Sequence, residues 1–438
     1  MNPKIAIEKK REGRSLDDAE IREFVNGFTS GGIPDCQMSA LAMAICCKGM
    51  DERETATLTD VMMRSGEMIR WPDAPPTADK HSTGGVGDKL SFITQPLAAA
   101  CGVSVPSLVG RGLGTTGGTA DKLEAIPGFR VSLSLDEFRR TVAETGLSLA
   151  TQTDEIAPAD RKLYALRDVT GTVASIPLIV SSILSKKLAE GAGALVFDVK
   201  CGAGAFMRRR EDAEELARAL VAGSKAAGRR AAALVTDMDA PLGFATGNAS
   251  EVAEALAILD GKADLGAAPV RLETELSVEL AALMVSLAKE TSLDDARAMC
   301  REKLADGSAA AKFRAMVAAQ GGDLDAFSAR FAEPSAKFRV QSMRSGYIAS
   351  IDARKVAEVA LSLGAGRAKP GDAIDFAAGV TLAVGVGDRV GLGSPLATLT
   401  ASDAEPDALE EAASELVGAF AFSRGPVEPP ASLVISRI

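Results

Sequence analysis

Two glycine-rich segments lie about thirty residues apart in the chain, at 80–88 (KHSTGGVGD) and 110–119 (GRGLGTTGGT). Each leads into a sequence that favours a helix. Glycine lets the backbone approach an anion closely, and the unpaired N–H groups at a helix N-terminus attract negative charge. Lys80 adds a positive charge, and Ser82 and Thr119 supply hydroxyl donors. The two segments therefore predict phosphate binding, beside the chain's single histidine.

The composition is that of an ordinary globular protein. Of its 438 residues, 47% are hydrophobic and 25% charged, enough for a sizeable core in about two or three domains. The formal net charge of -10 argues against nucleic acid or an acidic membrane surface as a partner. No signal-peptide core is seen at the N-terminus, and no uncharged apolar run reaches the roughly eighteen residues of a membrane span. We expect a cytoplasmic protein whose phosphate site is locally basic.

The cysteines show no CxxC spacing, and with one histidine they make a poor zinc-binding set. We expect reduced and mostly buried thiols. A catalytic cysteine–histidine pair is the alternative, and nothing in the spacing favours it. The six residues are Cys36, Cys46, Cys47, Cys101, Cys201 and Cys300.

The N-terminal sixty or so residues predict helices separated by capping residues. The pair Ser15 and Asp18 predicts one helix start. Pro34 predicts the next start, and the pair Asp51 and Glu54 predicts a third. The methionines of this region are expected in the core or at a subunit interface rather than at a ligand.

After these helices, short apolar runs alternate with helical stretches. The runs at 104–109, 194–200 and 231–236 predict strands, and 211–227 predicts a helix between two of them. This spacing is typical of a parallel sheet. A further helix is expected over 176–190, and its apolar positions need a partner surface such as the N-terminal helices.

The pattern changes again after about residue 335. A strand pair is expected over 338–352, followed by a helix over 353–363 and a second helix over 406–420. Short strands punctuated by glycine and proline lie between the two helices. This segment predicts a small α+β domain that closes the chain.

Two further segments, 159–168 (ADRKLYALRD) and 181–187 (SSILSKK), combine with the glycine-rich loops into a recognisable set. Three more motifs follow in order, namely DVKCGAGAFM at 198–207, DMDAPLG at 237–243 and GNASEV at 247–252. With these motifs the chain resembles the thymidine phosphorylase and pyrimidine-nucleoside phosphorylase family over nearly its whole length.

The resemblance implies an α/β fold, in which a helical domain faces a larger mixed or parallel α/β domain across a cleft. A C-terminal α+β domain completes it, and the helical domain forms a homodimer. The implied boundaries are 1–66 and 159–190 for the helical domain, 67–158 and 191–334 for the α/β domain, and 335–438 for the C-terminal domain.

The resemblance also implies a reaction, the reversible phosphorolysis of pyrimidine nucleosides. Inorganic phosphate is the co-substrate, the products are the free base and a pentose 1-phosphate, and no organic cofactor takes part. The family's phosphate-binding positions are matched by Lys80, Ser82, Ser91 and Thr119. We expect Ser91 in the first turn of the helix after the first loop, where its hydroxyl and the helix dipole act together.

The family's nucleoside-binding positions are matched by Leu113, Arg167, Ser182 and Lys186. Ser182 and Lys186 are four residues apart on a predicted helix and therefore share one face. Arg167 and Lys186 would stabilise negative charge on the departing pyrimidine. His81 is expected to act as a hydrogen-bond donor or general acid toward the base, because its ordinary pKa is near neutrality.

Structural roles are the alternatives for these residues. His81 can pack a loop, Arg167 can form an ion pair with Asp160 or Asp168, and Lys186 can belong to an exposed basic helix face.

Some family members bind a monovalent cation where the first loop meets a later helix. The matching positions here are Gly87, Lys89, Leu242, Ala245 and Glu254. If the Lys89 side chain folds inward, its ammonium lies near the cation position. If it points away, the Lys89 carbonyl can still serve as a ligand.

This chain departs from the family pattern at three positions. Val109 stands where the family has a serine, and Thr115 where it has a histidine. Ser107 stands where thymidine-selective members carry methionine and broader pyrimidine-nucleoside members carry lysine. Three interpretations follow: an ordinary phosphorylase, an enzyme with altered sugar or base preference, and a weakened relative that binds without turnover. The retained site residues favour activity.

Two other enzyme classes are weaker alternatives. Anthranilate phosphoribosyltransferases have a related architecture and a similar phosphate loop, but they would not require Arg167 or Lys186. A P-loop kinase is disfavoured because no GxxxxGK[ST] pattern occurs.

Overall fold

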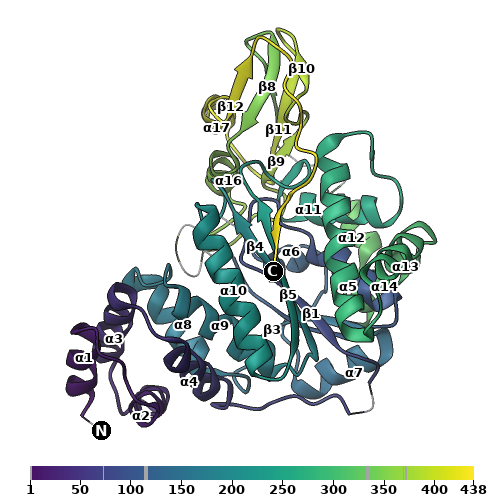
Figure 1. Ribbon diagram of the computed structural model, residues 1–438. Coiled ribbons are helices and arrows are strands. Elements are labelled where there is room, and N and C mark those ends of the chain that lie inside the picture. Colours follow the sequence, from purple (N-terminus) through teal and green to yellow (C-terminus); the bar gives the residue numbers. More distant parts are fainter. Residues whose placement is uncertain (1, 73, 113–116, 332–335, 368, 370–371) are drawn as a thin grey trace.

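The computed structural model describes residues 2–72, 74–112, 117–331, 336–367, 369 and 372–438. Figure 1 shows the N-terminal helices at one side, a central part in which helices flank a sheet, and a third part at one end that contains the late strands. The predicted fold class, α/β with a helical domain and a C-terminal α+β domain, is confirmed.

The helical domain is built from two separate stretches of the chain. Leu163 and Leu178 from the second stretch pack into the same apolar cluster as Leu41 and Leu58 from the first. The expectation that 176–190 packs against the N-terminal helices is therefore confirmed. The helices are α1 (Pro3–Arg11), α2 (Asp18–Thr29), α3 (Asp35–Lys48), α4 (Glu52–Met63), α8 (Pro158–Thr170) and α9 (Ile176–Ala189).

Reciprocal capping bonds fix two of the helix starts. The carboxylate of Asp51 accepts from the Glu54 backbone and Glu54 binds back, as predicted. The start of α2 differs from the prediction, because Asp17 and Glu20, rather than Ser15 and Asp18, form the reciprocal pair there. Ser15 instead donates to Asp51 at 2.9 Å. The prediction from Ser15 is wrong because a glutamate three residues after a cap completes both bonds, and Asp17 has one.

The central sheet has the strand order β1-β4-β5-β13. The first three strands run parallel, and the last strand of the chain pairs antiparallel with β5. In Figure 1 the chain end descends from the C-terminal part to this sheet. The strands are β1 (Ala78–Ser82), β4 (Ala194–Cys201), β5 (Arg230–Asp237) and β13 (Val434–Arg437).

Both faces of the sheet are covered, as parallel sheets require. On β4, Leu195 and Phe197 belong to the cluster that contains residues of α9 and α10 (Arg210–Ala226). Val196 points the other way, into the cluster formed with α5 (Ser91–Ala100) and α12 (Ala268–Lys289). The alternation follows from the two-residue period of a strand. Through its other apolar residues α9 thus joins the helical domain to the sheet.

A second, two-stranded parallel sheet pairs β2 (Val105–Val109) with β3 (Leu147–Thr151). The predicted strands at 104–109, 194–200 and 231–236 are therefore all present. The remaining helices of the α/β domain are α6 (Thr119–Glu124), α7 (Leu135–Thr145), α11 (Ala249–Leu259), α13 (Leu293–Ala305), α14 (Ser308–Ala319) and α15 (Leu324–Phe331).

The C-terminal part contains two sheets, with orders β6-β9-β11-β7 and β10-β8-β12. The two strands expected over 338–352 exist, but they lie in different sheets and do not form a pair. The Ser342 hydroxyl binds the backbone of Arg344 in a turn that directs the chain from one sheet to the other. The elements are β6 (Ala245–Gly247), β7 (Ala336–Gln341), β8 (Gly346–Ile351), α16 (Ala353–Ser362), β9 (Gly379–Leu382), β10 (Arg389–Val390), β11 (Pro395–Ala401), α17 (Pro406–Val417) and β12 (Phe420–Ser423).

All six thiols are free, but only Cys101, Cys201 and Cys300 are buried, while Cys36 and Cys47 are exposed. The expectation of mostly buried thiols is therefore only half met. Among the described residues, no helix is both long and apolar enough to cross a membrane.

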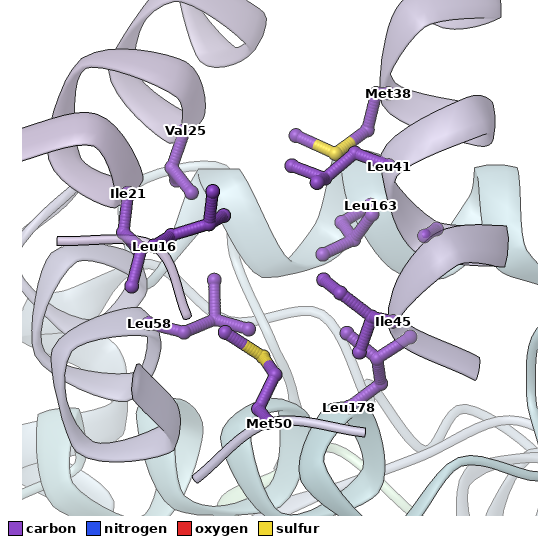
Figure 2. A pocket seen from close by; sticks show the side chains of 11 residues that line it. Leu16, Ile21, Val25, Met38, Leu41, Ile45, Met50, Leu58, Leu163 and Leu178 are labelled. Atoms are coloured by element: carbon purple, nitrogen blue, oxygen red, sulfur yellow. The ribbon is translucent and has the colours of Figure 1, made fainter. Parts of the chain in front are cut away.

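A small apolar cavity of about 20 Å³ marks the junction between the two stretches of the helical domain. Figure 2 shows Leu163 and Leu178 facing Ile45 and Met38 around it. The junction is close-packed around this small void, so removing side-chain volume there leaves an enlarged cavity.

We predict that Leu163→Ala lowers the free energy of unfolding by about 2–5 kcal/mol, because the site cannot collapse around the lost atoms. Urea denaturation measures this change. The matched control is Val169→Ala on the same helix, where the side chain is 74% exposed and we expect a change within about 0.5 kcal/mol. Equal losses in the two variants would contradict a packed junction.

Candidate active site

A cavity of about 840 Å³ lies between the helical domain and the α/β domain. This volume is typical of a small-molecule site. The cavity is lined by all the predicted phosphate- and nucleoside-binding residues that the structure describes, namely Lys80, His81, Ser82, Ser91, Thr119, Arg167, Ser182 and Lys186. Leu113 and Thr115 lie outside the described residues.

Lys80 lies on β1 and points its ammonium to the end of the sheet. In the parallel register of β1 and β4, Ser82 lies opposite Asp198. The Lys80 Nζ is 3.9 Å from Asp88 Oδ1 and 3.8 Å from Asp198 Oδ2. The side chain is buried, and within the described residues Nζ has no hydrogen-bond partner. Leaving buried donors unsatisfied costs free energy, so an anion in the cavity would be a favourable ligand for this ammonium.

Asp88 organises the first loop. The Ser82 hydroxyl donates to the Asp88 carboxylate and accepts from the Gly84 N–H at 3.1 Å. Lys122 donates to the Asp88 backbone carbonyl at 2.9 Å. Burial favours the neutral carboxyl, but the positive charges led by Lys80 outweigh it and hold the pKa of Asp88 well below its usual range. Sequence reasoning gave Asp88 no role, although it ends the first glycine-rich segment.

Two helix starts face the same end of the cavity. Ser91 is the first residue of α5, as predicted, and Thr119 is the first residue of α6. Val109 ends β2 and lines the cavity with methyl groups, where the family pattern has a hydroxyl. The loop before α5 also needs close backbone packing, since a Cβ on Gly85 would lie 2.5 Å from the Met238 sulfur.

His81, the next residue after Lys80 on β1, also lines the cavity. Burial first, and then the nearby charges of Lys187 and Lys186, lower the pKa of His81 well below its ordinary value. The imidazole is therefore neutral at physiological pH. Of the two expected roles, this environment favours a hydrogen-bond donor over a general acid.

The opposite wall carries the pair that was expected to share a helix face. On α9 the Lys186 ammonium donates to the Ser182 hydroxyl at 3.0 Å. It also donates to the Asp160 carboxylate on α8. Lys186 lies 5.7 Å from the ring centroid of Tyr164. Its side chain is only 19% exposed, so it does not belong to an exposed basic face.

Arg167 is buried and lines the cavity, but its guanidinium is already engaged. Its Nε donates to Thr172 O at 3.1 Å, one Nη to Leu178 O at 2.9 Å and the other to Val173 O at 2.7 Å. These acceptors are backbone carbonyls rather than the Asp160 or Asp168 carboxylates considered from the sequence. In this conformation Arg167 fixes the loop between α8 and α9 and thereby shapes the wall.

A buried polar network lies behind Ser107. The Ser107 hydroxyl accepts from Gln95 Nε2 at 2.9 Å, and the same amide donates to Asp79. Lys187 donates to Asp79 and to Glu190. Burial, with the charge of Asp79 as the next cause, raises the pKa of Glu190 well above its usual value. Sequence reasoning missed this network because its members are far apart in the chain.

Lys89 folds inward, which selects one of the two orientations considered from the sequence. Its Nζ lies 2.7 Å from Glu254 Oε2. Burial disfavours the charged amine, but Glu254 and Glu273 outweigh this and raise the pKa of Lys89 above its ordinary value. The ammonium therefore lies at the position where the resemblance placed a cation.

The chain matches three domain families in order. Residues 4–66 match the helical bundle domain of the glycosyl transferase family, residues 74–310 its a/b domain, and residues 347–419 the pyrimidine nucleoside phosphorylase C-terminal domain. A solved anthranilate phosphoribosyltransferase from Thermus thermophilus has a similar fold, with a TM-score of 0.58 and 22% identity over 72% of this chain and 99% of that one.

Curated relatives match along the whole length. A pyrimidine-nucleoside phosphorylase of Geobacillus stearothermophilus is 45% identical over 436 residues, which cover 99% of this chain and 98% of the relative. A thymidine phosphorylase of Mesorhizobium japonicum is 43% identical over 442 residues, which cover 100% and 99%. The chain therefore belongs to the thymidine phosphorylase and pyrimidine-nucleoside phosphorylase family.

Proposed function

We propose that the protein catalyses the reversible phosphorolysis of pyrimidine nucleosides such as thymidine, deoxyuridine and uridine. The products are the free pyrimidine and ribose or deoxyribose 1-phosphate, which makes the enzyme a pentosyltransferase. One observation carries this proposal. A cavity of nucleoside size has a buried ammonium without a hydrogen-bond partner among the described residues, Lys80, at one end, and a lysine–serine pair at the other.

At the phosphate end, we assign Lys80 and the start of α5 to the nucleophile. Phosphate must approach the anomeric carbon of the sugar while the glycosidic bond breaks. The Lys80 ammonium and the N–H groups at Ser91 can hold it there. The Ser82 proton now points to Asp88, so Ser82 contributes to phosphate as a donor only after its hydroxyl rotates.

At the base end, negative charge grows on the pyrimidine as the bond breaks, and the sugar becomes oxocarbenium-like. Lys186 is positioned to stabilise this anion, and Ser182 fixes the direction of its ammonium. The neutral imidazole of His81 can donate its N–H to a pyrimidine carbonyl without transferring a proton. For Arg167 we propose an indirect role through the cavity wall, since each of its three guanidinium nitrogens already donates to a backbone carbonyl.

The phosphoribosyltransferase alternative rests on fold alone, because the solved anthranilate phosphoribosyltransferase shares 22% identity with this chain. The phosphorylases match 98% or more of their own length at 43–45% identity. We also propose a cytoplasmic location, which is supported by the six free thiols, because disulfides are rare in cytosolic proteins.

We predict that two lysine variants are impaired toward different substrates. Lys80→Ala should lose roughly 10²–10³-fold in kcat/KM for phosphate, and Lys186→Ala should raise KM for the nucleoside more than KM for phosphate. Release of free base from thymidine, deoxyuridine and uridine, with and without phosphate, measures both. Lys225→Ala on the exposed side of α10 is the matched control.

Several outcomes would contradict the assignment. Base release without phosphate would indicate a hydrolase, and activity only with phosphoribosyl pyrophosphate and magnesium would indicate a phosphoribosyltransferase. Nucleoside binding without any release would indicate a binding protein. Equal loss of phosphate and nucleoside binding in Lys186→Ala would remove its role at the base.

We predict that His81 does not titrate in the working range. Its pKa is lowered, so the neutral form, with its one N–H donor, persists as the pH falls through 6.5. Because phosphate also titrates near neutrality, the pH profile of kcat/KM is compared between the wild type and His81→Gln, which keeps an N–H donor. The two profiles should have the same shape, and His81→Ala should lose about 10-fold or more relative to His81→Gln. A loss of activity at higher pH in the wild type but not in His81→Gln would restore the general acid, because a general acid must be protonated to act.

We also propose a homodimer through the helical domain. Ile5 on α1 is 57% exposed and Met43 on α3 is 43% exposed, and the two helices pack together. Light scattering should give twice the 45.2 kDa chain mass, and Met43→Glu should lower it. Leu392→Glu, at an exposed position of the C-terminal domain, is the control. A wild-type mass of one chain would exclude the dimer.

A further inference from the structure

The side chain of Lys89 ends in a closed shell of oxygen atoms. Its Nζ lies 2.7 Å from Leu242 O and 3.3 Å from Ala245 O. It lies 2.7 Å from Glu254 Oε2 and 3.4 Å from Glu273 Oε1. The side chain has no exposed surface, so water cannot replace these contacts. We call these four oxygen-bearing residues the oxygen shell.

The shell has the chemistry of a cation site. Backbone carbonyls and carboxylates are the ligands that hard cations take in proteins. The family resemblance places a monovalent cation at Gly87, Lys89, Leu242, Ala245 and Glu254, so the expected site and the oxygen shell coincide. In this chain, however, the centre of the oxygen shell is already occupied by the Lys89 ammonium.

The packing leaves no place for a second cation. A Cβ on Gly243 would lie 2.3 Å from Glu273 Oε2 and 2.8 Å from Lys89 Nζ. A Cβ on Gly87, whose φ is +67°, would lie 2.7 Å from Leu242 O. Glycine is required at both positions because the backbone closes around the shell. The residues present therefore do not fit an additional metal ion.

We propose that the Lys89 ammonium is a built-in replacement for the monovalent cation of related enzymes. Ammonium and potassium ions carry the same charge and are similar in size, so a tethered ammonium can satisfy the same oxygens. The protein then needs no alkali cation for stability or for activity. This inference concerns the shell itself and stands whether or not the proposed reaction is correct.

The shell holds the phosphate loop to the rest of the α/β domain. Lys89 is in the segment that follows Gly87, and its N–H donates to Gly87 O at 2.9 Å. The Leu242 N–H donates to Val86 O at 3.1 Å. Glu254 also accepts from the backbone N–H groups of Phe244 and Ala245, where β6 begins. Lys89 is thus a positioning residue, which acts on phosphate through the loop.

The wild type is tested first. We expect its melting temperature in KCl or NaCl to equal that in choline chloride at the same ionic strength, within about 1 °C, and its kcat/KM to be unchanged. A cation present at a hundred times its Kd would raise the melting temperature by roughly 3–5 °C. Such a rise in the wild type would overturn the proposal.

The second test creates the missing ion site. Lys89→Thr should melt about 3–10 °C lower in choline chloride, because the buried Glu254 carboxylate loses its positively charged partner. Potassium or ammonium chloride should restore at least about half of that loss and lower the raised KM for phosphate. Lys89→Met keeps the stem without the charge, so it should lose stability and gain nothing from cations. Lys262→Thr, at an exposed lysine, should behave as the wild type.

The remaining outcomes of these variant experiments also test whether the Lys89 ammonium replaces a cation. Lys89→Thr with wild-type stability and no cation response would show that the ammonium is dispensable, and equal recovery of Lys89→Met in KCl would show a general salt effect. Either result overturns the proposal. If Lys89→Thr folds only when purified in KCl, removal of KCl measures the cation dependence directly. If Lys89→Thr does not fold in any of these salts, the comparison of wild-type melting temperatures between salts still tests the proposal.

Discussion

The balance of buried charge around Asp88 and Asp198 governs the phosphate end of the cavity. Lys200 lies 2.7 Å from Asp198, and Lys122 lies 2.6 Å from Glu251. These pairs are close, whereas Lys80 is almost 4 Å from each of its carboxylates. The carboxylates compensate the buried positive charge of Lys80 while leaving its donors available. Without them a buried ammonium would be too costly to maintain.

Much of this site could be predicted from sequence, because its signals are local. Ser182 and Lys186 share a face through helix periodicity alone. Ser91 begins its helix as its motif indicated. The phosphate and base residues converge on one cavity because the carboxyl end of β1 faces α9.

What the sequence could not provide depends on long-range register. Asp198 matters because β4 pairs with β1 over a separation of more than a hundred residues. Two guanidinium nitrogens of Arg167 donate to carbonyls of Thr172 and Val173, in a loop whose conformation no motif specifies. Similarly, β7 and β8 are adjacent in sequence but join different sheets, because a short turn redirects the chain. Local periodicity identified each strand correctly and its partner wrongly.

The strand β13 gives the C-terminal domain two attachments to the core. The chain enters that domain at β7 and leaves it to pair with β5, while β6 from the α/β domain joins the sheet of β9. A domain fixed at both ends and along one sheet edge cannot swing as an independent arm. Relative movement between the cavity walls must therefore occur at the three connections of the helical domain, which include residues 64–72 and 74–77, 152–157 and 190–193. The α/β and C-terminal domains would then move together as one rigid body.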